Sequence, residues 1–337
     1  MFSFVISKTP YRVSFFGGGT DYPVWYRDNP GAVLATSIDK YCYIMCRWLP
    51  PFFEHKHHIS YSEIERPQEI DQIRHPAVRE ILRFRNIRDG VGIYHAGDLP
   101  ARTGMGTSSA FTVGLLHGIY TMERTSISRM ALALDAIHIE QEKIKEFVGS
   151  QDQATSAFGG FNRIKFSMEA DTHKIEVIPI KSKRPRELEK CLMLFFTGFS
   201  RTASNIAKGQ LERLGENKAI LRRFYEMVDE AKAILESKND LYQFGKLLNE
   251  SWNLKRRLSE QVSTDYIDYL YDSAISAGAI GGKLLGAGGG GFLLLFVEPD
   301  AQESVKRKLY SLLHVPFKFE YSGSQVIFNG DVKRRGK

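Results

Sequence analysis

Cysteines, long apolar runs and low-complexity segments are scarce or missing in this sequence. Three cysteines occur among 337 residues, and Cys42 and Cys46, four apart in a strand-like run, share one face of that run. No further ligands stand at a spacing suited to a metal, so we expect buried core thiols there. No apolar run is long enough for a membrane-spanning helix, and the first residues lack the pattern of a signal peptide. We therefore expect a cytoplasmic protein with no membrane partner.

The charge is ordinary in amount but basic in balance, with a net charge of +7. Such a balance favours an anionic partner: a nucleotide, a sugar phosphate or a nucleic acid. The basic residues are mostly scattered, and no helix-turn-helix, zinc-finger or RNA-binding pattern occurs, so we expect no nucleic-acid partner. The histidine-rich segment 54–60 falls in a predicted hairpin loop, for which we favour a plain loop over a metal site.

The order of patterns along the chain predicts an α+β protein with two closely joined halves, 1–185 and 186–337. The first sixty residues alternate short apolar runs with turns, which indicates strands. Helices are predicted from near Ser108, over about 126–147, 204–237, 240–261 and 264–277. The segment 148–160 is predicted to be a loop. The charged stretch 181–190 is the candidate boundary, and strand, helix and strand signals close the chain.

The segment DLPARTGMGTSSAF, residues 98–111, joins a predicted strand to a predicted helix. Glycines let a ligand approach the backbone closely, and the free N–H groups and dipole of a helix N-terminus favour an anion. No Lys follows the second glycine as in a Walker A loop, and the third glycine of a dinucleotide-binding fingerprint is missing. The local chemistry therefore leaves two alternatives open, a phosphate-binding loop and a plain turn.

Two further segments are rich in glycine. Five glycines occur among residues 286–291, just before an apolar strand, which indicates either a tight strand entry or a loop that another backbone or a ligand approaches closely. In RVSFFGGGTDYP, residues 12–23, turn chemistry explains the three glycines. It does not explain why Thr20, Asp21 and Tyr22 follow them, and that set is suited to binding sugar hydroxyls.

One carboxylate stands out on the predicted helix 126–147. Spacings of four, three and four residues place Ala133, Ile137, Glu140 and Ile144 on one face, whereas Glu142 points elsewhere. Glu146 also points away from that face. A carboxylate on a buried face needs a partner or a metal ion.

The glycine-containing segments 12–23, 98–111 and 286–291, in the order in which they follow along the chain, resemble the motifs of the GHMP kinase superfamily. This superfamily includes galactokinase, mevalonate kinase and homoserine kinase. The resemblance covers nearly the whole chain. It implies a two-domain α+β fold, with an N-terminal domain like ribosomal protein S5 domain 2 and a C-terminal α/β sandwich. It also implies ATP and Mg²⁺ as cofactors.

The resemblance assigns the segment 98–111 to the triphosphate of ATP. The implied ATP-binding residues are Pro100, Gly104, Met105, Gly106, Thr107, Ser108 and Ser109. Ser109 and Glu140 resemble the Mg²⁺ ligands of the family, and Asp152 its catalytic aspartate, which Arg12 faces. Asp152 would accept the proton of the attacking hydroxyl, and Arg12 would balance the developing charge.

The first motif departs from that of galactokinases, which carry Gly-Glu-His-Thr-Asp-Tyr where this chain has residues 17–22, GGGTDY. Losing the Glu and His side chains leaves room for a longer acceptor. The segments FFGGGTDYP, DKYCYI and SQDQ resemble kinases that phosphorylate the anomeric hydroxyl of D-glycero-D-manno-heptose 7-phosphate, on the route to GDP-heptose for surface polysaccharide. The substrate-binding residues that the resemblance implies are Gly18, Gly19, Thr20, Asp21, Tyr22, Gln153, Arg201, Gly288 and Gly289.

Several alternatives stay open. Arg201 and Arg102 are candidates for holding the tail phosphate of the sugar phosphate, and a plain surface role suits either equally well. The acceptor could instead be fucose or another hexose. A sensor of the same fold is a third possibility, although Arg12, Ser109, Glu140 and Asp152 are all present. The expected partners are small molecules, a sugar phosphate and ATP, and both a monomer and a homodimer remain possible.

Overall fold

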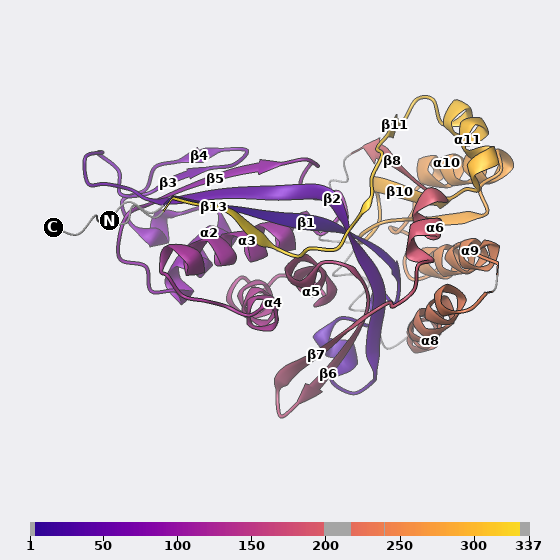
Figure 1. Ribbon diagram of the computed structural model, residues 1–337, viewed down its shortest axis with the longest axis horizontal. Helices are drawn as coiled ribbons and strands as arrows, with labels where there is room; N and C mark the ends of the chain where they lie inside the picture. The colour runs from indigo at the N-terminus through magenta and orange to yellow at the C-terminus, as the bar shows by residue number, and fades with distance from the viewer. Residues whose placement is uncertain (1–3, 199–216, 239, 331–337) are drawn as a thin grey trace.

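A computed structural model describes residues 4–198, 217–238 and 240–330 of the protein. Figure 1 shows long strands with helices packed below them at one end of the molecule and a second group of helices and strands at the other. Within the described residues the strands form a nine-stranded and a four-stranded sheet. The predicted α+β class is confirmed.

Two long antiparallel strands, β1 (Phe4–Phe16) and β2 (Gly31–Trp48), form the spine of the first sheet. Because β2 is 18 residues long, it pairs with β5 (Val91–Gly97) near one end and with β6 (Phe161–Glu169) near the other. The hairpin partner of β6 is β7 (Thr172–Pro179). The short strands β3 (His58–Ser60) and β4 (Ile64–Glu65) extend the sheet beyond β5. In this arrangement β1 and β2 extend from one end of the molecule toward the other (Figure 1).

Helices α2 (Pro76–Phe84), α3 (Thr107–Met122), α4 (Arg129–Ile137) and α5 (Gln151–Phe158) cover one face of this sheet (Figure 1). The central helix α3 is apolar on nearly all sides and packs directly against β1 and β2. A helix that is hydrophobic all round is one that is buried. It begins one residue before the predicted start at Ser108.

One prediction in this half is right only in part, and another is wrong. The predicted helix 126–147 is observed as α4 followed directly by a π-helical turn, His138–Lys143, in which Ile144 N–H donates to Ile139 O. Such a turn inserts a residue into the helical ladder, which a periodicity of 3.6 does not reveal. The predicted loop 148–160 contains α5, eight residues that are too few to show helical periodicity and that end at Gly159, whose φ is +68°.

The second half contains the four-stranded sheet, with strand order β11 (Leu313–His314), β8 (Leu192–Gly198), β10 (Gly291–Phe296) and β9 (Gly281–Leu284). Its helices are α6 (Pro185–Lys190), α8 (Lys218–Glu236), α9 (Tyr242–Arg256), α10 (Asp265–Ser276) and α11 (Gln302–Lys308). The predicted helices 240–261 and 264–277 are confirmed as α9 and α10. The predicted helix 204–237 is observed as α8 from residue 218, and 204–216 lie outside the described residues.

The division of the chain into 1–185 and 186–337 stays a prediction, to which the strand pairing adds one fact. Strands β12 (Phe319–Glu320) and β13 (Gln325–Asn329), from the end of the chain, pair with β2 and β1. The last described residues therefore belong to the first sheet. The helix α1 (Pro23–Tyr26) follows the glycine turn after β1 and packs near β6.

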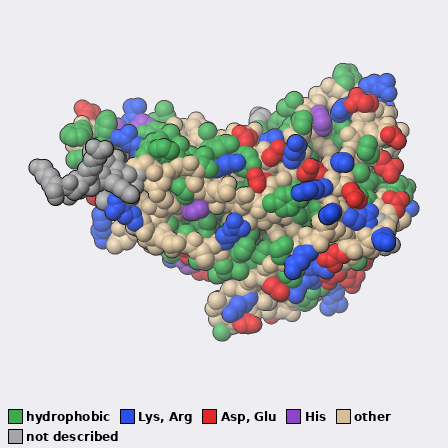
Figure 2. Space-filling model, viewed as in Figure 1, with side chains coloured by type: hydrophobic (Ala, Val, Ile, Leu, Met, Phe, Trp, Pro, Cys, Tyr) green, Lys and Arg blue, Asp and Glu red, His purple; other side chains and the backbone are tan. Residues whose placement is uncertain are grey.

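The expected absences can be compared with the described part of the chain. Cys42 and Cys46 are both fully buried, as expected of core thiols. Within residues 4–198, 217–238 and 240–330 no group of three or more His, Cys, Asp and Glu side chains could hold a metal, and no helix is long and apolar enough to cross a membrane. On the face shown in Figure 2, basic and acidic side chains are interspersed, so the positive net charge is not gathered there into one patch.

Candidate active site

The loop that precedes α3 carries its backbone in conformations that only glycine adopts easily. Gly104 and Gly106 have φ values of +79° and +71°, and Gly106 immediately precedes the first turn of α3. A Cβ on Gly106 would lie 3.1 Å from Arg12 Cγ and 3.3 Å from Asp152 Oδ2. No side chain of the described residues caps the helix, so its first N–H groups are available to a ligand. The loop therefore has the geometry of an anion site at a helix N-terminus.

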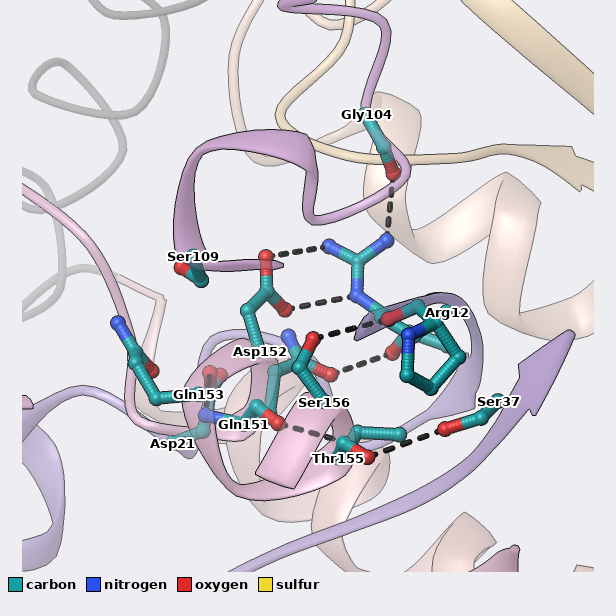
Figure 3. Close-up of polar contacts among 12 residues, drawn as sticks. Arg12, Asp21, Ser37, Gly104, Ser109, Gln151, Asp152, Gln153, Thr155 and Ser156 are labelled. Atoms are coloured by element: carbon teal, nitrogen blue, oxygen red, sulfur yellow. Dashed lines mark hydrogen bonds and ion pairs between the residues drawn. The ribbon is translucent and has the colours of Figure 1, made fainter. Parts of the chain in front are cut away.

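Arg12, from β1, and Asp152, from α5, form a bidentate ion pair directly beneath this loop (Figure 3). The guanidinium donates from Nε to Oδ1 at 2.7 Å and from Nη2 to Oδ2 at 2.8 Å. Its Nη1 donates to Gly104 O at 2.5 Å, which ties the pair to the loop. Arg12 is buried, whereas the Asp152 side chain keeps 22% of its surface exposed. One carboxylate is thus oriented by a fixed cation and still reachable from solvent.

Glu140 lies fully buried behind the loop, where the π-helical turn points it toward the start of α3. Ser109 Oγ donates to its Oε2 at 2.8 Å, and Gln153 Nε2 donates to the same oxygen at 2.5 Å. Burial raises the pKa of Glu140 to about 7, although hydrogen bonds such as the one from Ser109 oppose the rise. Its Oε1 accepts no hydrogen bond from the described residues. A hydroxyl and a carboxylate with a spare oxygen fit Mg²⁺, which prefers oxygen ligands.

Asp21 forms the other wall of the site, after the glycine turn that ends β1. Its Oδ1 accepts from Gly19 N at 2.9 Å and its Oδ2 from Gln151 N at 3.4 Å. Burial, and then the negative charge of Asp152, raise the pKa of Asp21 to about 6. Thr20 is buried and donates its hydroxyl to Gly17 O and Ala32 O, at 2.8 and 2.9 Å. Thr20 therefore holds the turn in shape rather than facing the site.

These elements enclose a cavity of about 590 Å³. The predicted residues that line it are Arg12, Gly18, Gly19, Asp21, Tyr22, Arg102, Gly104, Gly106, Thr107, Ser108, Ser109 and Asp152. The predicted residues that do not line it are Pro100, Met105, Thr20, Glu140, Gln153, Gly288 and Gly289. Arg201 lies outside the described residues. A larger hollow of about 770 Å³, lined by residues 48–53, 55–56, 88–90 and 122–124 among others, contains none of the predicted site residues.

The glycine-rich loop after β9 makes its close contacts with backbone. A Cβ on Gly286 would lie 2.4 Å from Gly104 Cα, so the two glycine loops pack directly on one another. Gly289 N donates to Val262 O at 3.0 Å, and a Cβ on Gly288 would lie 2.6 Å from the same oxygen. Of the sequence-based alternatives for this loop, the close approach of another backbone is confirmed. Gly288 and Gly289 face the segment before α10 and not the cavity.

Sequence analysis missed two lysines of the second half, Lys255 on α9 and Lys283 on β9, which both line the cavity. Lys283 Nζ donates to Phe15 O at 2.8 Å, and Lys255 Nζ donates to Leu284 O at 3.0 Å and to Gly286 O at 2.5 Å. The one available signal was a lysine inside the apolar and glycine-rich run IGGKLLG. A charged residue in such a run indicates a buried charge that needs a hydrogen-bonding or oppositely charged partner.

Two family models match the chain. The model described as GHMP kinases N terminal domain matches residues 73–160, and the model described as GHMP kinases C terminal matches residues 227–314. The first covers the loop 98–106, α3 and the whole segment that carries Glu140 and Asp152. The second covers α9, Lys283 and the glycine-rich loop.

Individual proteins are similar over nearly the full length. The D-glycero-alpha-D-manno-heptose 7-phosphate kinase of Campylobacter jejuni is 28% identical over 318 residues, 90% of this chain and 92% of that protein. The galactokinase of Pyrococcus furiosus is 25% identical over 336 residues, 88% of this chain and 90% of that protein.

Among solved structures, a D-glycero-D-manno-heptose 1-phosphate kinase from Bacteroides thetaiotaomicron superimposes with a TM-score of 0.77 at 25% identity, covering 96% of this chain and 98% of that one. The galactokinase of Lactococcus lactis in complex with galactose gives a TM-score of 0.71 at 19% identity, covering 96% of this chain and 95% of that one. The latter similarity shows the fold alone.

Proposed function

The chain belongs to the GHMP kinase family and is a phosphotransferase with a sugar hydroxyl as acceptor, and we propose that this hydroxyl is the anomeric one of D-glycero-D-manno-heptose 7-phosphate. The predicted two-domain GHMP kinase fold is confirmed by the same comparisons. Kinases of this family use ATP, which assigns the phosphate donor. The product would be the 1,7-bisphosphate, formed in the cytoplasm on the route to GDP-heptose for surface polysaccharide.

The observation that carries the proposed chemistry is the Arg12–Asp152 pair at 2.7 and 2.8 Å. The pair lies between the loop suited to phosphates and the turn that carries Asp21, as Figure 3 shows. Asp152 accepts the proton of the anomeric hydroxyl as the oxygen attacks the γ-phosphate. Arg12 orients the carboxylate and adds positive charge where negative charge develops. Phosphoryl transfer depends mostly on such positioning and charge stabilisation.

The loop that contains Gly104 and Gly106, with the first turn of α3, holds the triphosphate through backbone N–H groups. Ser109 and Glu140 would hold Mg²⁺. When bound there, the ion would neutralise part of the charge on the phosphates. Gln153 donates to Glu140 and orients this carboxylate. Gln153 therefore positions the proposed metal ligand Glu140, whereas sequence analysis placed Gln153 in the sugar site.

The acceptor is supported by the room at Gly18 and by similarity. The nearest atom to a Cβ built on Gly18 is Gln151 Nε2, at 3.9 Å. Gly18 stands where galactokinases carry a glutamate, so this chain leaves open a volume that a galactokinase fills. The seven-carbon acceptor is also that of the C. jejuni relative, which matches over 90% of this chain.

The test is ATP-dependent turnover with Mg²⁺ on D-glycero-D-manno-heptose 7-phosphate, mannose 6-phosphate, L-fucose and galactose. Release of ADP on the heptose phosphate, and its loss in Asp152→Asn, is the expected result. Turnover on an unphosphorylated hexose alone would refute the proposed acceptor and leave the kinase mechanism standing. Binding of ATP without turnover on any sugar would favour a sensor of the same fold.

A further inference from the structure

Lys255 and Lys283 line the cavity, but the chemistry proposed above uses neither. Lys283 extends from β9 with only 6% of its surface exposed, and its Nζ donates to Phe15 O at 2.8 Å. Lys255 is half-buried on α9, and its Nζ donates to Leu284 O and Gly286 O. Carbonyl oxygens satisfy part of each ammonium group's hydrogen-bonding capacity, but they carry no formal charge. When protonated, each lysine therefore carries a positive charge that these contacts do not compensate.

No carboxylate of the described residues forms an ion pair with either lysine. Arg12 repels the positive charge of Lys283, whereas Asp21 attracts it. Burial, followed by repulsion from Arg12, lowers the pKa of Lys283 to about 7. Burial, then Lys283 and Arg12, hold the pKa of Lys255 well below its usual range. Burying cations without counter-charges is costly, and a bound anion would relieve that cost.

Both lysines line the cavity, and each is tied to a different backbone segment. Through Phe15, Lys283 adjoins the glycine turn that carries Asp21, and through Gly286, Lys255 adjoins Gly104. Ser251, one helical turn before Lys255 on α9, lines the same wall. The cations thus come from the second half of the chain, whereas the loop for ATP and Asp152 come from the first.

We propose that Lys255 and Lys283 bind the phosphate group that the sugar acceptor already carries. The inference rests on the proposed function and names the residues that select a phosphorylated acceptor. A phosphate dianion is negatively charged and accepts hydrogen bonds, and the two lysines supply positive charge and N–H donors. The γ-phosphate of ATP is the other possible source of such a dianion. It already has the N-terminus of α3, Arg12 and the proposed metal ligands to bind it.

This assignment replaces the sequence-based candidates for the tail phosphate. Arg102 lines the cavity, and its backbone N–H donates to the Thr107 hydroxyl at 3.2 Å. Arg102 therefore belongs to the loop for ATP. Arg201 lies outside the described residues.

The experiment compares kcat/KM for D-glycero-D-manno-heptose 7-phosphate and for the same heptose without its phosphate, in the wild type, Lys283→Met and Lys255→Met. We expect kcat/KM for the phosphorylated acceptor to fall about tenfold or more in each variant, since each loses a charged hydrogen bond. For the unphosphorylated heptose kcat/KM should change less than about twofold, as should KM for ATP. Lys246→Met is the matched control, because Lys246 is an exposed lysine on the same helix α9.

Two outcomes overturn the proposal. One is a rise in KM for ATP in the lysine variants while their preference for the phosphorylated heptose over the unphosphorylated one stays that of the wild type. This result would assign the lysines to the triphosphate. The other is a wild type that uses both heptoses equally well. Thermal unfolding of both variants shows whether a loss of activity is a loss of fold, and unchanged turnover of the unphosphorylated heptose shows the same directly.

A binding measurement separates this inference from the proposed function. If the wild type turns over no sugar phosphate, the proposed acceptor fails, and calorimetric titration with inorganic phosphate then tests the lysines alone. The titration is made with a non-hydrolysable ATP analogue bound, so that the loop for ATP is filled. Phosphate binding that is lost in Lys283→Met and kept in Lys246→Met supports the site, and equal binding in the two variants refutes it.

Discussion

Arg12 and Asp152 stand 140 residues apart in the sequence, yet the guanidinium of one contacts both carboxylate oxygens of the other, at 2.7 and 2.8 Å. The third contact of Arg12, to Gly104 O, joins the pair to the loop that precedes α3. One arginine therefore sets the position of the proposed base relative to the proposed phosphate site. A shift in this guanidinium would move both, and phosphoryl transfer is sensitive to such displacement.

Replacing Asp152 by Asn removes the proposed base and keeps the shape of the side chain. We expect kcat to fall by about 10²–10⁴-fold, the usual contribution of a positioned general base, with ATP binding retained. Asp171→Asn is the matched control, because the Asp171 carboxylate is 90% exposed. A kcat within about tenfold of the wild type would show that another group accepts the proton.

Replacing Glu140 by Gln removes the charge from the proposed metal ligand. We expect the Mg²⁺ concentration at half-maximal activity to rise by at least about tenfold, while ATP binding without Mg²⁺ is unchanged. Both quantities come from a Mg²⁺ titration of activity and a calorimetric ATP titration. In the control Glu142→Gln, the carboxylate that is replaced is largely exposed, on the outer side of the same turn. Identical Mg²⁺ dependence in the two variants would rule out Glu140 as a ligand.

Gly149 leaves just enough space for Asp21. A Cβ on Gly149 would lie 1.9 Å from Asp21 Oδ2, so Gly149→Ala must displace this carboxylate. We expect KM for the sugar to rise and the free energy of unfolding to fall by about 1–3 kcal/mol. In the control Gly18→Ala the nearest atom is 3.9 Å away, and we expect stability within about 0.5 kcal/mol of the wild type. Urea unfolding of both variants checks this pair, and equal stability would contradict it.

The open volume at Gly18 predicts a change of specificity. Gly18→Glu restores the side chain that galactokinases carry there. We expect kcat/KM for the heptose phosphate to fall about tenfold or more relative to kcat/KM for a hexose, because the side chain occupies space that only the longer acceptor needs. The two acceptors are compared in one competition assay. A loss of the same size for both would show that the volume at Gly18 does not select the acceptor.

The buried carboxylate of Asp21 predicts a dependence of stability on pH. Its pKa is raised from 3.8 to about 6, so the protonated form stabilises the fold below 3.8, and that stabilisation is lost as pH rises through 6. The difference corresponds to roughly 3 kcal/mol of unfolding free energy. Relative to Asp21→Asn, the wild type should therefore lose stability between about pH 4 and about pH 6 and show no further difference at higher pH. Urea unfolding across this range checks the sign, and a difference that is constant with pH would contradict it.

Short motifs made much of the site predictable. The five glycines among residues 286–291 indicated the close approach of another backbone or a ligand, and the structure shows such an approach between Gly286 and Gly104. The spacing of Glu140 predicted a buried carboxylate, and Glu140 is fully buried beside Ser109. The roles of these residues in binding ATP, Mg²⁺ and sugar stay predictions.

The predictions that failed concern features that the local sequence does not show. Helix α5 was predicted to be a loop because eight residues between two glycine-containing turns show no period, and its stability comes from packing against α4 and α3. The π-helical turn was missed because the local sequence resembles an ordinary helix. Gln153 and Thr20 were assigned to the sugar, yet both turn away from the cavity and hydrogen-bond within the protein.

By itself, the sequence determined the family, the α+β class and the segments around Arg12, Gly104, Glu140 and Asp152, because such motifs record local needs of the backbone and of the chemistry. Only the tertiary structure decided which charges share the cavity. Lys255 has no local mark of function and Lys283 has only its place in a glycine-rich run, and they meet Arg12 and Asp21 only because the second half of the chain folds against β1. Electrostatic partnership depends on distance in space, and a linear pattern does not encode that distance.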